Sequence, residues 1–141
     1  MIWFDNLRVV GTPNYYVQKL FANNKGTNVV PILKDNETLT GKDSLYASAT
    51  TEKTTKEVII KLVNTSSKKM DIDIFVEGTQ VDKKPMICQV LTATDIYSYN
   101  TLDNPKNIYP AEKALICSGN KVPVIMDGRS VVVLRVGVKR L

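Results

Sequence analysis

Few residues in this 141-residue chain could carry chemistry, because it contains no histidine. That absence excludes Ser-His-Asp and Cys-His nucleophilic sites and removes the commonest metal ligand. The glutamates that could serve as general acids or bases are Glu37, Glu52, Glu57, Glu77 and Glu112. Each is flanked by polar or turn residues, so we expect all of them to face water and not to form the close carboxylate pair that acid–base hydrolysis needs. The sequence therefore predicts no catalytic residue, no metal site and no cofactor.

A cluster of tyrosines offers the one candidate binding site. Tyr97, Tyr99 and Tyr109 lie around the polar segment 100–105, which begins with Asn100. Aromatic faces beside amide groups could hold a sugar by stacking and hydrogen bonding. The alternative is a long loop that its tyrosines pin to the rim of the fold.

Cys88 and Cys117 are the only cysteines, and each lies in an apolar run typical of a strand. Their separation excludes a CxxC redox or zinc motif. Buried free thiols are one interpretation, and a disulfide between neighbouring strands is the other.

The elements that position these residues fall into two kinds. An apolar strand at residues 2–5 precedes a helix in which Thr12 is the N-cap and Pro13 occupies the first turn. From about Asn28 onward, alternating apolar and polar residues between turn signals predict only strands. The predicted strands are 29–33, 45–50, 57–64, 70–77, 86–92, 114–118, 121–126 and 131–138.

Residue alternation predicts which side chains these strands bury. In the last strand Val132, Leu134 and Val136 point one way and Arg135 points the other. Ile59 and Phe75 break the alternation in their strands, so we expect those strands to be covered on both faces or to lie against a further part of the protein.

The net charge of +5 could suggest a nucleic-acid partner, but the basic residues are scattered along the chain in pairs such as Lys68-Lys69 and Lys83-Lys84. Acidic residues lie between them, and no basic stretch is interleaved with aromatic residues. We therefore predict no nucleic-acid binding. No apolar run approaches the ~20 residues of a membrane span, so we predict no membrane partner.

Five segments of the sequence are similar to segments of a known protein family. The carrying segments are Ile2-Trp3-Phe4-Asp5-Asn6, Gly11-Thr12-Pro13-Asn14-Tyr15-Tyr16-Val17-Gln18-Lys19-Leu20-Phe21, Leu45-Tyr46-Ala47-Ser48-Ala49, Val58-Ile59-Ile60-Lys61-Leu62-Val63-Asn64 and Asn100-Thr101-Leu102-Asp103-Asn104-Pro105. Together they resemble the C-terminal part of α-L-arabinofuranosidases of glycoside hydrolase family fifty-one. The resemblance implies an all-β fold, a C-terminal β-sandwich of jelly-roll type, preceded by the last strand and helix of a (β/α)8 barrel. It places residues 1–26 in the barrel and residues 27–141 in the sandwich.

The resemblance also implies a function. The two catalytic glutamates would lie upstream in the barrel, so this part would be non-catalytic, while the parent would remove terminal α-L-arabinofuranosyl groups from arabinan or arabinoxylan with retention. The partners would be the rest of the barrel and, through it, arabinose-containing polysaccharide, in a bacterial protein that is periplasmic or secreted. Asp5 and Asn6 would lie at the barrel end where such active sites are built, or would form a simple strand-to-helix connection.

Two further expectations concern the 141-residue chain when the rest of that barrel is absent. Apolar residues such as Trp3, Phe4 and Leu20 would fold back onto the sandwich or promote self-association, and one sheet edge would remain open. Two functions of other classes remain open: a stand-alone carbohydrate-binding module, and a protein-interaction sandwich of immunoglobulin type with a Cys–Cys bridge over a core tryptophan.

Overall fold

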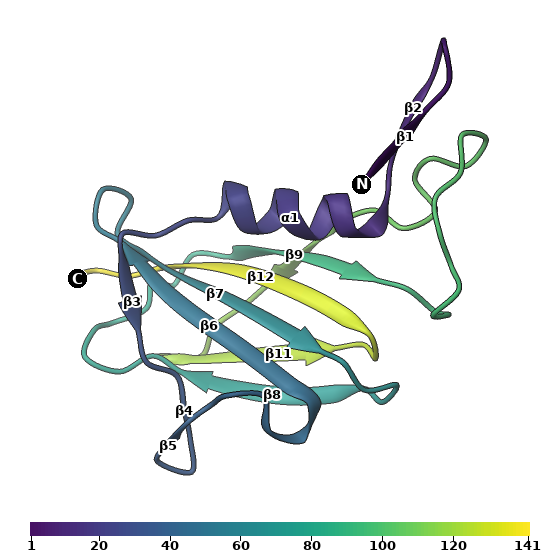
Figure 1. Cartoon of the computed structure of the whole chain (residues 1–141). Coiled ribbons are helices and arrows are strands. Elements are labelled where there is room, and N and C mark those ends of the chain that lie inside the picture. Colours follow the sequence, from purple (N-terminus) through teal and green to yellow (C-terminus); the bar gives the residue numbers. More distant parts are fainter.

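The computed structural model describes residues 1–141 as a β-sandwich that carries a projecting hairpin and one α-helix (Figure 1). The hairpin consists of β1 (Ile2–Phe4) and β2 (Val9–Gly11), which pair antiparallel. Helix α1 (Pro13–Asn23) follows directly, and its N-cap is Thr12, whose hydroxyl accepts a hydrogen bond from the Tyr15 N–H. The predicted cap and helix are confirmed, whereas the partner strand β2 was not foreseen.

Two antiparallel sheets form the sandwich, which confirms the predicted fold class. The larger sheet has the order β10-β9-β12-β7-β6-β3, and the smaller contains β11 and β8. A short β4–β5 hairpin and a 3-10 turn at Lys42–Ser44 complete the fold. The strand bounds are β3 Asn28–Val30, β4 Leu33–Lys34, β5 Glu37–Thr38, β6 Leu45–Glu52, β7 Glu57–Asn64, β8 Met70–Phe75, β9 Met86–Thr92, β10 Ala111–Leu115, β11 Lys121–Met126 and β12 Ser130–Gly137.

Three predicted strand boundaries are wrong, two of them for local reasons. Strand β3 stops at Val30 because Pro31 has no N–H to donate to a ladder. Strand β10 ends at Leu115, since Ser118 already pairs with Lys121 across a tight turn in which Gly119 has a positive φ. Strand β8 ends at Phe75, two residues earlier than the alternation suggested.

The main core lies between the two sheets. Val132, Leu134 and Val136 of β12 are fully buried there, as the alternation predicted, and Val122 and Met126 of β11 meet them from the smaller sheet. Because that sheet has only two strands, β8 and β11 each keep one edge without a strand neighbour. Whether a strand from a longer protein pairs with one of these edges stays a prediction.

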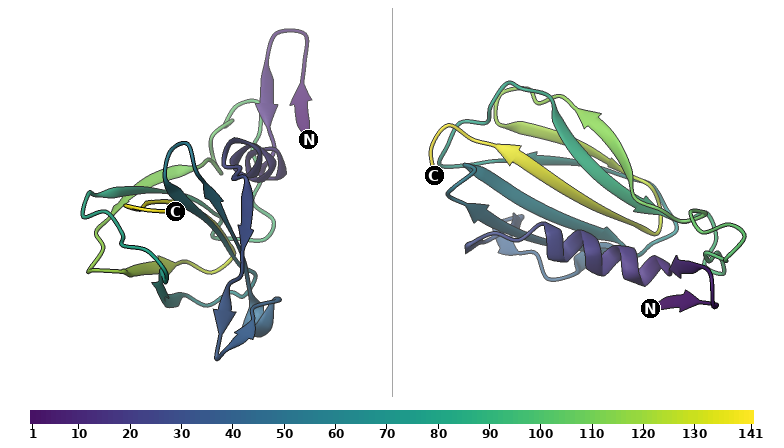
Figure 2. Two further views of the ribbon diagram at one scale, coloured as in Figure 1. Left: turned by 90° about the vertical axis from the view of Figure 1, so that its left-hand side faces the viewer. Right: turned by 90° about the horizontal axis from the view of Figure 1, so that it is seen from above.

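Helix α1 covers the outer face of the larger sheet. In one view of Figure 2 the helix is seen end-on beside the sheet, and in the other it lies along the strands. Leu20 packs there with Ile59, Leu91, Ile108 and Val133 in a second, smaller core. This contact explains why Ile59 breaks the alternation of β7: both faces of that strand are buried. Phe75 differs, because it is exposed to solvent.

The only α-helix has 11 residues and does not meet the length or hydropathy of a membrane-spanning helix.

Candidate functional site

The turn of the N-terminal hairpin is held by Asp5. Its carboxylate accepts hydrogen bonds from the Leu7 N–H at 2.8 Å and the Arg8 N–H at 2.7 Å, and it pairs with the Arg8 guanidinium at 3.0 Å. The two backbone donors, followed by Arg8, lower the pKa of this carboxyl group. Asp5 thus has local partners within the turn between β1 and β2, so it does not form the direct strand-to-helix connection expected from the sequence. Substrate contact by Asp5 and Asn6 in a longer protein stays a prediction.

The tyrosine-bearing segment 95–110 is tied to this hairpin by Asn100. The Asn100 Nδ2 donates to the carbonyls of Gly11 (2.8 Å) and Ile108 (2.9 Å), and its Oδ1 accepts from the Ile108 N–H at 2.6 Å. The side chain is buried and all three hydrogen bonds are internal. A second tie joins Arg8 to Asp103 at 2.8 Å. Asn100 therefore positions the loop, and its amide is not free for the sugar contact predicted from the sequence.

The three tyrosines of this loop do not share one environment. Tyr97 is 79% exposed and Tyr99 67% exposed. Tyr109 instead packs edge-to-face against Tyr16 of α1, with ring centroids 4.9 Å apart. The loop is therefore pinned by Tyr109 and Asn100, while two aromatic rings stay open to solvent. Sugar binding at the exposed tyrosines remains a prediction.

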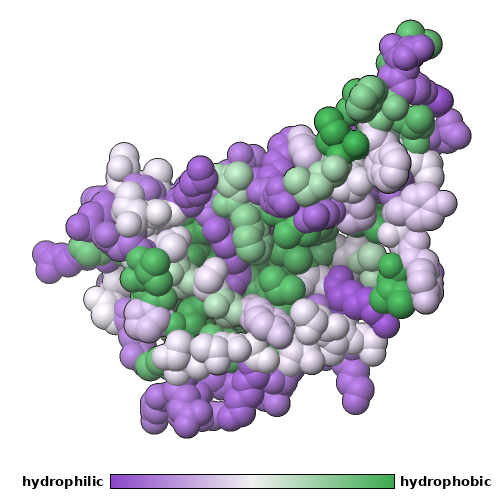
Figure 3. Space-filling model, in the orientation of Figure 1, coloured by the Kyte–Doolittle hydropathy of each residue, from purple (hydrophilic) through white to green (hydrophobic).

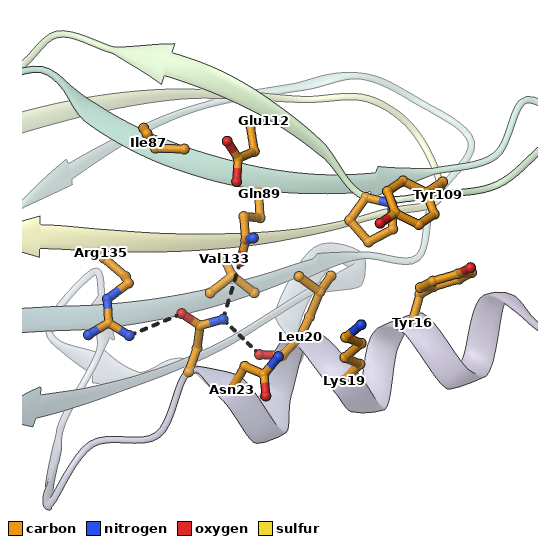
Figure 4. Close-up of a pocket in the computed structure, with 12 residues that line it drawn as sticks. Tyr16, Lys19, Leu20, Asn23, Ile87, Gln89, Tyr109, Glu112, Val133 and Arg135 are labelled. Atoms are coloured by element: carbon orange, nitrogen blue, oxygen red, sulfur yellow. Dashed lines mark hydrogen bonds between the residues drawn. The ribbon is translucent and has the colours of Figure 1, made fainter. Parts of the chain in front are cut away.

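A groove of about 650 Å³ runs between α1 and strands β9, β10 and β12 (Figure 4). Its floor is formed by side chains of the sheet's outer face, among them Gln89 and Val133, and its helical wall includes Lys19 and Asn23. Sequence reasoning missed this groove because its residues alternate with core residues on separate strands, and no motif links them to the helix.

A hydrogen-bonded network closes one end of the groove. The Asn24 amide donates to the Leu20 carbonyl at 2.8 Å and to Gln89 at 3.3 Å, and it accepts from Arg135 at 3.3 Å. Arg135 also forms a two-point ion pair with Glu57, at 3.2 and 2.5 Å. Because Asn24 directly follows the helix, this network fixes the end of α1 on the sheet.

The Glu57–Arg135 pair corrects one expectation from the sequence. Glu57 is half-buried and not fully solvated, and its hydrogen bonds with Arg135 lower the pKa of the carboxyl group against the opposing effect of burial. Of the other glutamates, Glu37, Glu77 and Glu112 are exposed and Glu52 is half-buried.

Cys88 and Cys117 are free thiols. Of the two interpretations of the sequence, free thiols or a disulfide between neighbouring strands, the structure has the first. Cys88 is buried, while Cys117 is half-buried with its Sγ 3.8 Å from the Met86 sulfur. Burial raises the pKa of both thiols, so neither has the low pKa of a reactive nucleophile. The structure contains no cluster of three or more histidine, cysteine, aspartate or glutamate side chains that could hold a metal ion.

Comparison with known proteins accounts for this combination of hairpin, helix and sandwich. The model of the α-L-arabinofuranosidase C-terminal domain family matches residues 1–130. The chain belongs to this family. The match includes the hairpin and α1 as well as most of the sandwich, so the resemblance read from the sequence is confirmed.

The relatives of this α-L-arabinofuranosidase domain are much longer proteins, and the chain matches only a part of each. The chain is 32% identical to α-L-arabinofuranosidase 2 of Arabidopsis thaliana over 117 residues, which are 81% of the chain and 17% of the relative. It is 31% identical to α-L-arabinofuranosidase 1 of the same plant over 137 residues, 92% of the chain and 19% of the relative. The chain thus spans less than a fifth of the length of these curated relatives.

Solved structures show the same arrangement. An arabinose-bound α-L-arabinofuranosidase of glycoside hydrolase family 51 superposes with a TM-score of 0.84 at 26% identity, covering 98% of this chain and 21% of that one. The family 51 arabinofuranosidase from Xanthomonas axonopodis pv. citri superposes with a TM-score of 0.75 at 24% identity, over 96% of this chain and 28% of its own. The second likeness concerns the fold alone.

Proposed function

We propose that this domain is the non-catalytic C-terminal sandwich of an α-L-arabinofuranosidase and that it supports a catalytic (β/α)8 barrel. In that protein residues 1–26 would complete the barrel, residues 27–141 would form the sandwich, and the barrel would supply the two glutamates. The reaction would remove terminal α-L-arabinofuranosyl groups from arabinan or arabinoxylan through a covalent glycosyl-enzyme, with retention. Family membership and the small share of each relative that the chain covers support this proposal.

The observation that carries the proposal is the apolar surface of the projecting hairpin. Trp3 is 67% exposed, Phe4 75% and Leu7 94%, and the space-filling view shows apolar side chains on this projection at the upper right (Figure 3). Burying one such side chain stabilises a contact by ~1.5–3 kcal/mol. Three large apolar residues exposed together are typical of an interface, and a barrel joined to this hairpin is the partner that the family suggests.

The same residues would make the separate chain self-associate. A fluorescent dye that binds apolar surfaces should bind the chain, and Trp3→Asp should weaken that binding and shift the chain toward monomer in gel filtration. Ile125→Asp is the matched control, because Ile125 is an exposed apolar residue on β11. Equal effects of the two substitutions would argue against a specific surface on the hairpin.

The non-catalytic assignment has a direct test with p-nitrophenyl α-L-arabinofuranoside. We expect the purified 141-residue chain to release no nitrophenolate above the rate in buffer alone, whatever the concentration of the chain. Turnover that scales with protein concentration and survives repurification would overturn the assignment.

A second candidate function, sugar binding by the sandwich, is favoured by the exposed rings of Tyr97 and Tyr99. Isothermal titration with arabino-oligosaccharides and arabinoxylan oligosaccharides should give saturable heat if these rings stack on sugars, and Tyr97→Ala with Tyr99→Ala should abolish it. An absence of heat at millimolar ligand would leave structural support as the role of the domain.

The immunoglobulin-type alternative loses its support. That fold would need a bridge between sheets packed on a core tryptophan. Cys88 and Cys117 are unbridged, and Trp3 lies on the exposed hairpin outside the sandwich.

A further inference from the structure

Three segments that are far apart in the sequence meet at the end of the sandwich opposite the N-terminal hairpin (Figure 1). They are the β6–β7 turn (52–57), the segment after β8 (77–84) and the C-terminal residues 137–141. The Val138 N–H donates to the Lys56 carbonyl at 2.9 Å, and the Lys139 N–H donates to the Gln80 carbonyl at 2.9 Å. Backbones joined in this way lie about 5 Å apart, so Lys56 lies beside Val138 and Gln80 lies beside Lys139, and the three segments adjoin at this end of the sandwich.

This surface, which we call the basic end, concentrates charge that is scattered in the sequence. Its acidic side chains are Glu52, Glu77 and Asp82, besides Glu57, which is paired with Arg135, and the terminal carboxylate. None of its basic side chains forms an ion pair. Its exposed basic residues are Lys53, Lys56, Lys83, Lys84, Lys139 and Arg140.

A hollow without any hydrophobic residue lies within the basic end. Gly78, Thr79 and Gln80 line one side, and Lys139 and Arg140 line the other. The Thr79 hydroxyl exchanges hydrogen bonds with the backbone of Arg140, which fixes the two sides to each other. The Thr79 hydroxyl is occupied by these bonds, so the groups that the depression offers to a ligand are the Gln80 side chain and the cations of Lys139 and Arg140, which suit a polar and negatively charged ligand.

We propose that the basic end binds a carboxylated polysaccharide, in addition to any role of the domain beside a catalytic barrel. Unpaired cations within a Debye length of about 8 Å act together on a polymer with closely spaced charges. Nucleic acid fits less well, because segments 52–57, 77–84 and 137–141 contain no aromatic residue on which bases could stack. Most of the basic residues are lysines, whose ammonium groups act as point charges. They can bind isolated carboxylates without the two-point geometry of an arginine–carboxylate pair.

Polygalacturonate, with a carboxylate on every sugar, is the probe, and neutral linear arabinan is the control polymer. Binding of the 141-residue chain is measured by affinity electrophoresis or titration at 50 mM and 500 mM NaCl. The test variant is Lys83→Glu/Lys84→Glu. The matched control is Lys68→Glu/Lys69→Glu, a pair of exposed lysines beyond the other end of β7, and both variants change the net charge from +5 to +1. Circular dichroism checks that both variants are folded.

We expect polygalacturonate binding that weakens at 500 mM NaCl, no binding to arabinan, and about a tenfold loss of affinity in Lys83→Glu/Lys84→Glu alone. Equal losses in the two variants would show attraction to net charge without a site and would overturn the proposal. So would an absence of binding at 50 mM NaCl, or tighter binding to single-stranded DNA than to polygalacturonate. None of these results depends on whether the domain supports a catalytic barrel.

Discussion

Replacing Asn100 by alanine tests whether this side chain is a structural pin. The substitution removes three hydrogen bonds, two to the carbonyls of Gly11 and Ile108 and one from the Ile108 N–H. Each is worth about 0.5–1.5 kcal/mol net. Because Asn100 and Ile108 are both buried, water replaces little of the loss, and we expect the free energy of unfolding to fall by about 2–4 kcal/mol.

Two measurements check this expectation. Urea unfolding gives the global free energy, and hydrogen exchange gives the protection of the Ile108 amide, which should fall sharply in Asn100→Ala. Asn107→Ala is the control, since Asn107 is exposed and donates only one hydrogen bond, to the Tyr99 carbonyl at 3.1 Å. If Asn100→Ala cost less than about 0.5 kcal/mol and left Ile108 protected, the claim that this amide anchors the loop would be refuted.

The remaining predictions concern the helix–sheet contact, its ion pair and the thiols. Ile59→Ala should lower the free energy of unfolding by about 2–5 kcal/mol, because Ile59 is fully buried beneath α1, and Ile87→Ala, at an exposed position on β9, should change it little in the same urea titration. Glu57→Gln should cost about 1 kcal/mol at pH 7. The folded pKa of Glu57 lies below its ordinary value of 4.5, so this cost should persist above pH 4.5 and disappear as the pH falls through the lowered pKa; a constant cost would contradict the pairing. A thiol reagent should modify half-buried Cys117 before buried Cys88, which peptide mass spectrometry can follow, and the reverse order would be inconsistent with the structure.

Much of the sandwich could be predicted because alternation is a local property of the chain. The strand at Val131–Val138 shows its buried face in its own residues, and the structure buries Val132, Leu134 and Val136 as expected. The start of α1 was equally local, since Thr at the N-cap and Pro in the first turn favour a helix N-terminus through their own side chains. Strand β2 was not predicted because it is a strand only through its pairing with the three residues of β1, and no local sequence pattern indicates that pairing.

The sequence could not predict the separate environments of the residues in the candidate sugar site. Tyr97, Tyr99, Asn100 and Tyr109 are neighbours in sequence, yet the structure turns two of them to solvent and uses the other two to fix the loop. Which role each residue takes depends on Gly11 and Tyr16, about 90 residues away. No local pattern contains that information.

Composition and local order therefore determined the absence of histidine chemistry, the strand-rich architecture and the family resemblance. Only the tertiary structure decided that α1 lies on the outer face of the sheet, that Glu57 pairs with Arg135, and that Lys56 and Lys139 share one end of the molecule. The reason is physical: alternation and capping act over a few residues, whereas helix docking, ion pairing and charge clustering join groups that approach each other only after the chain has folded.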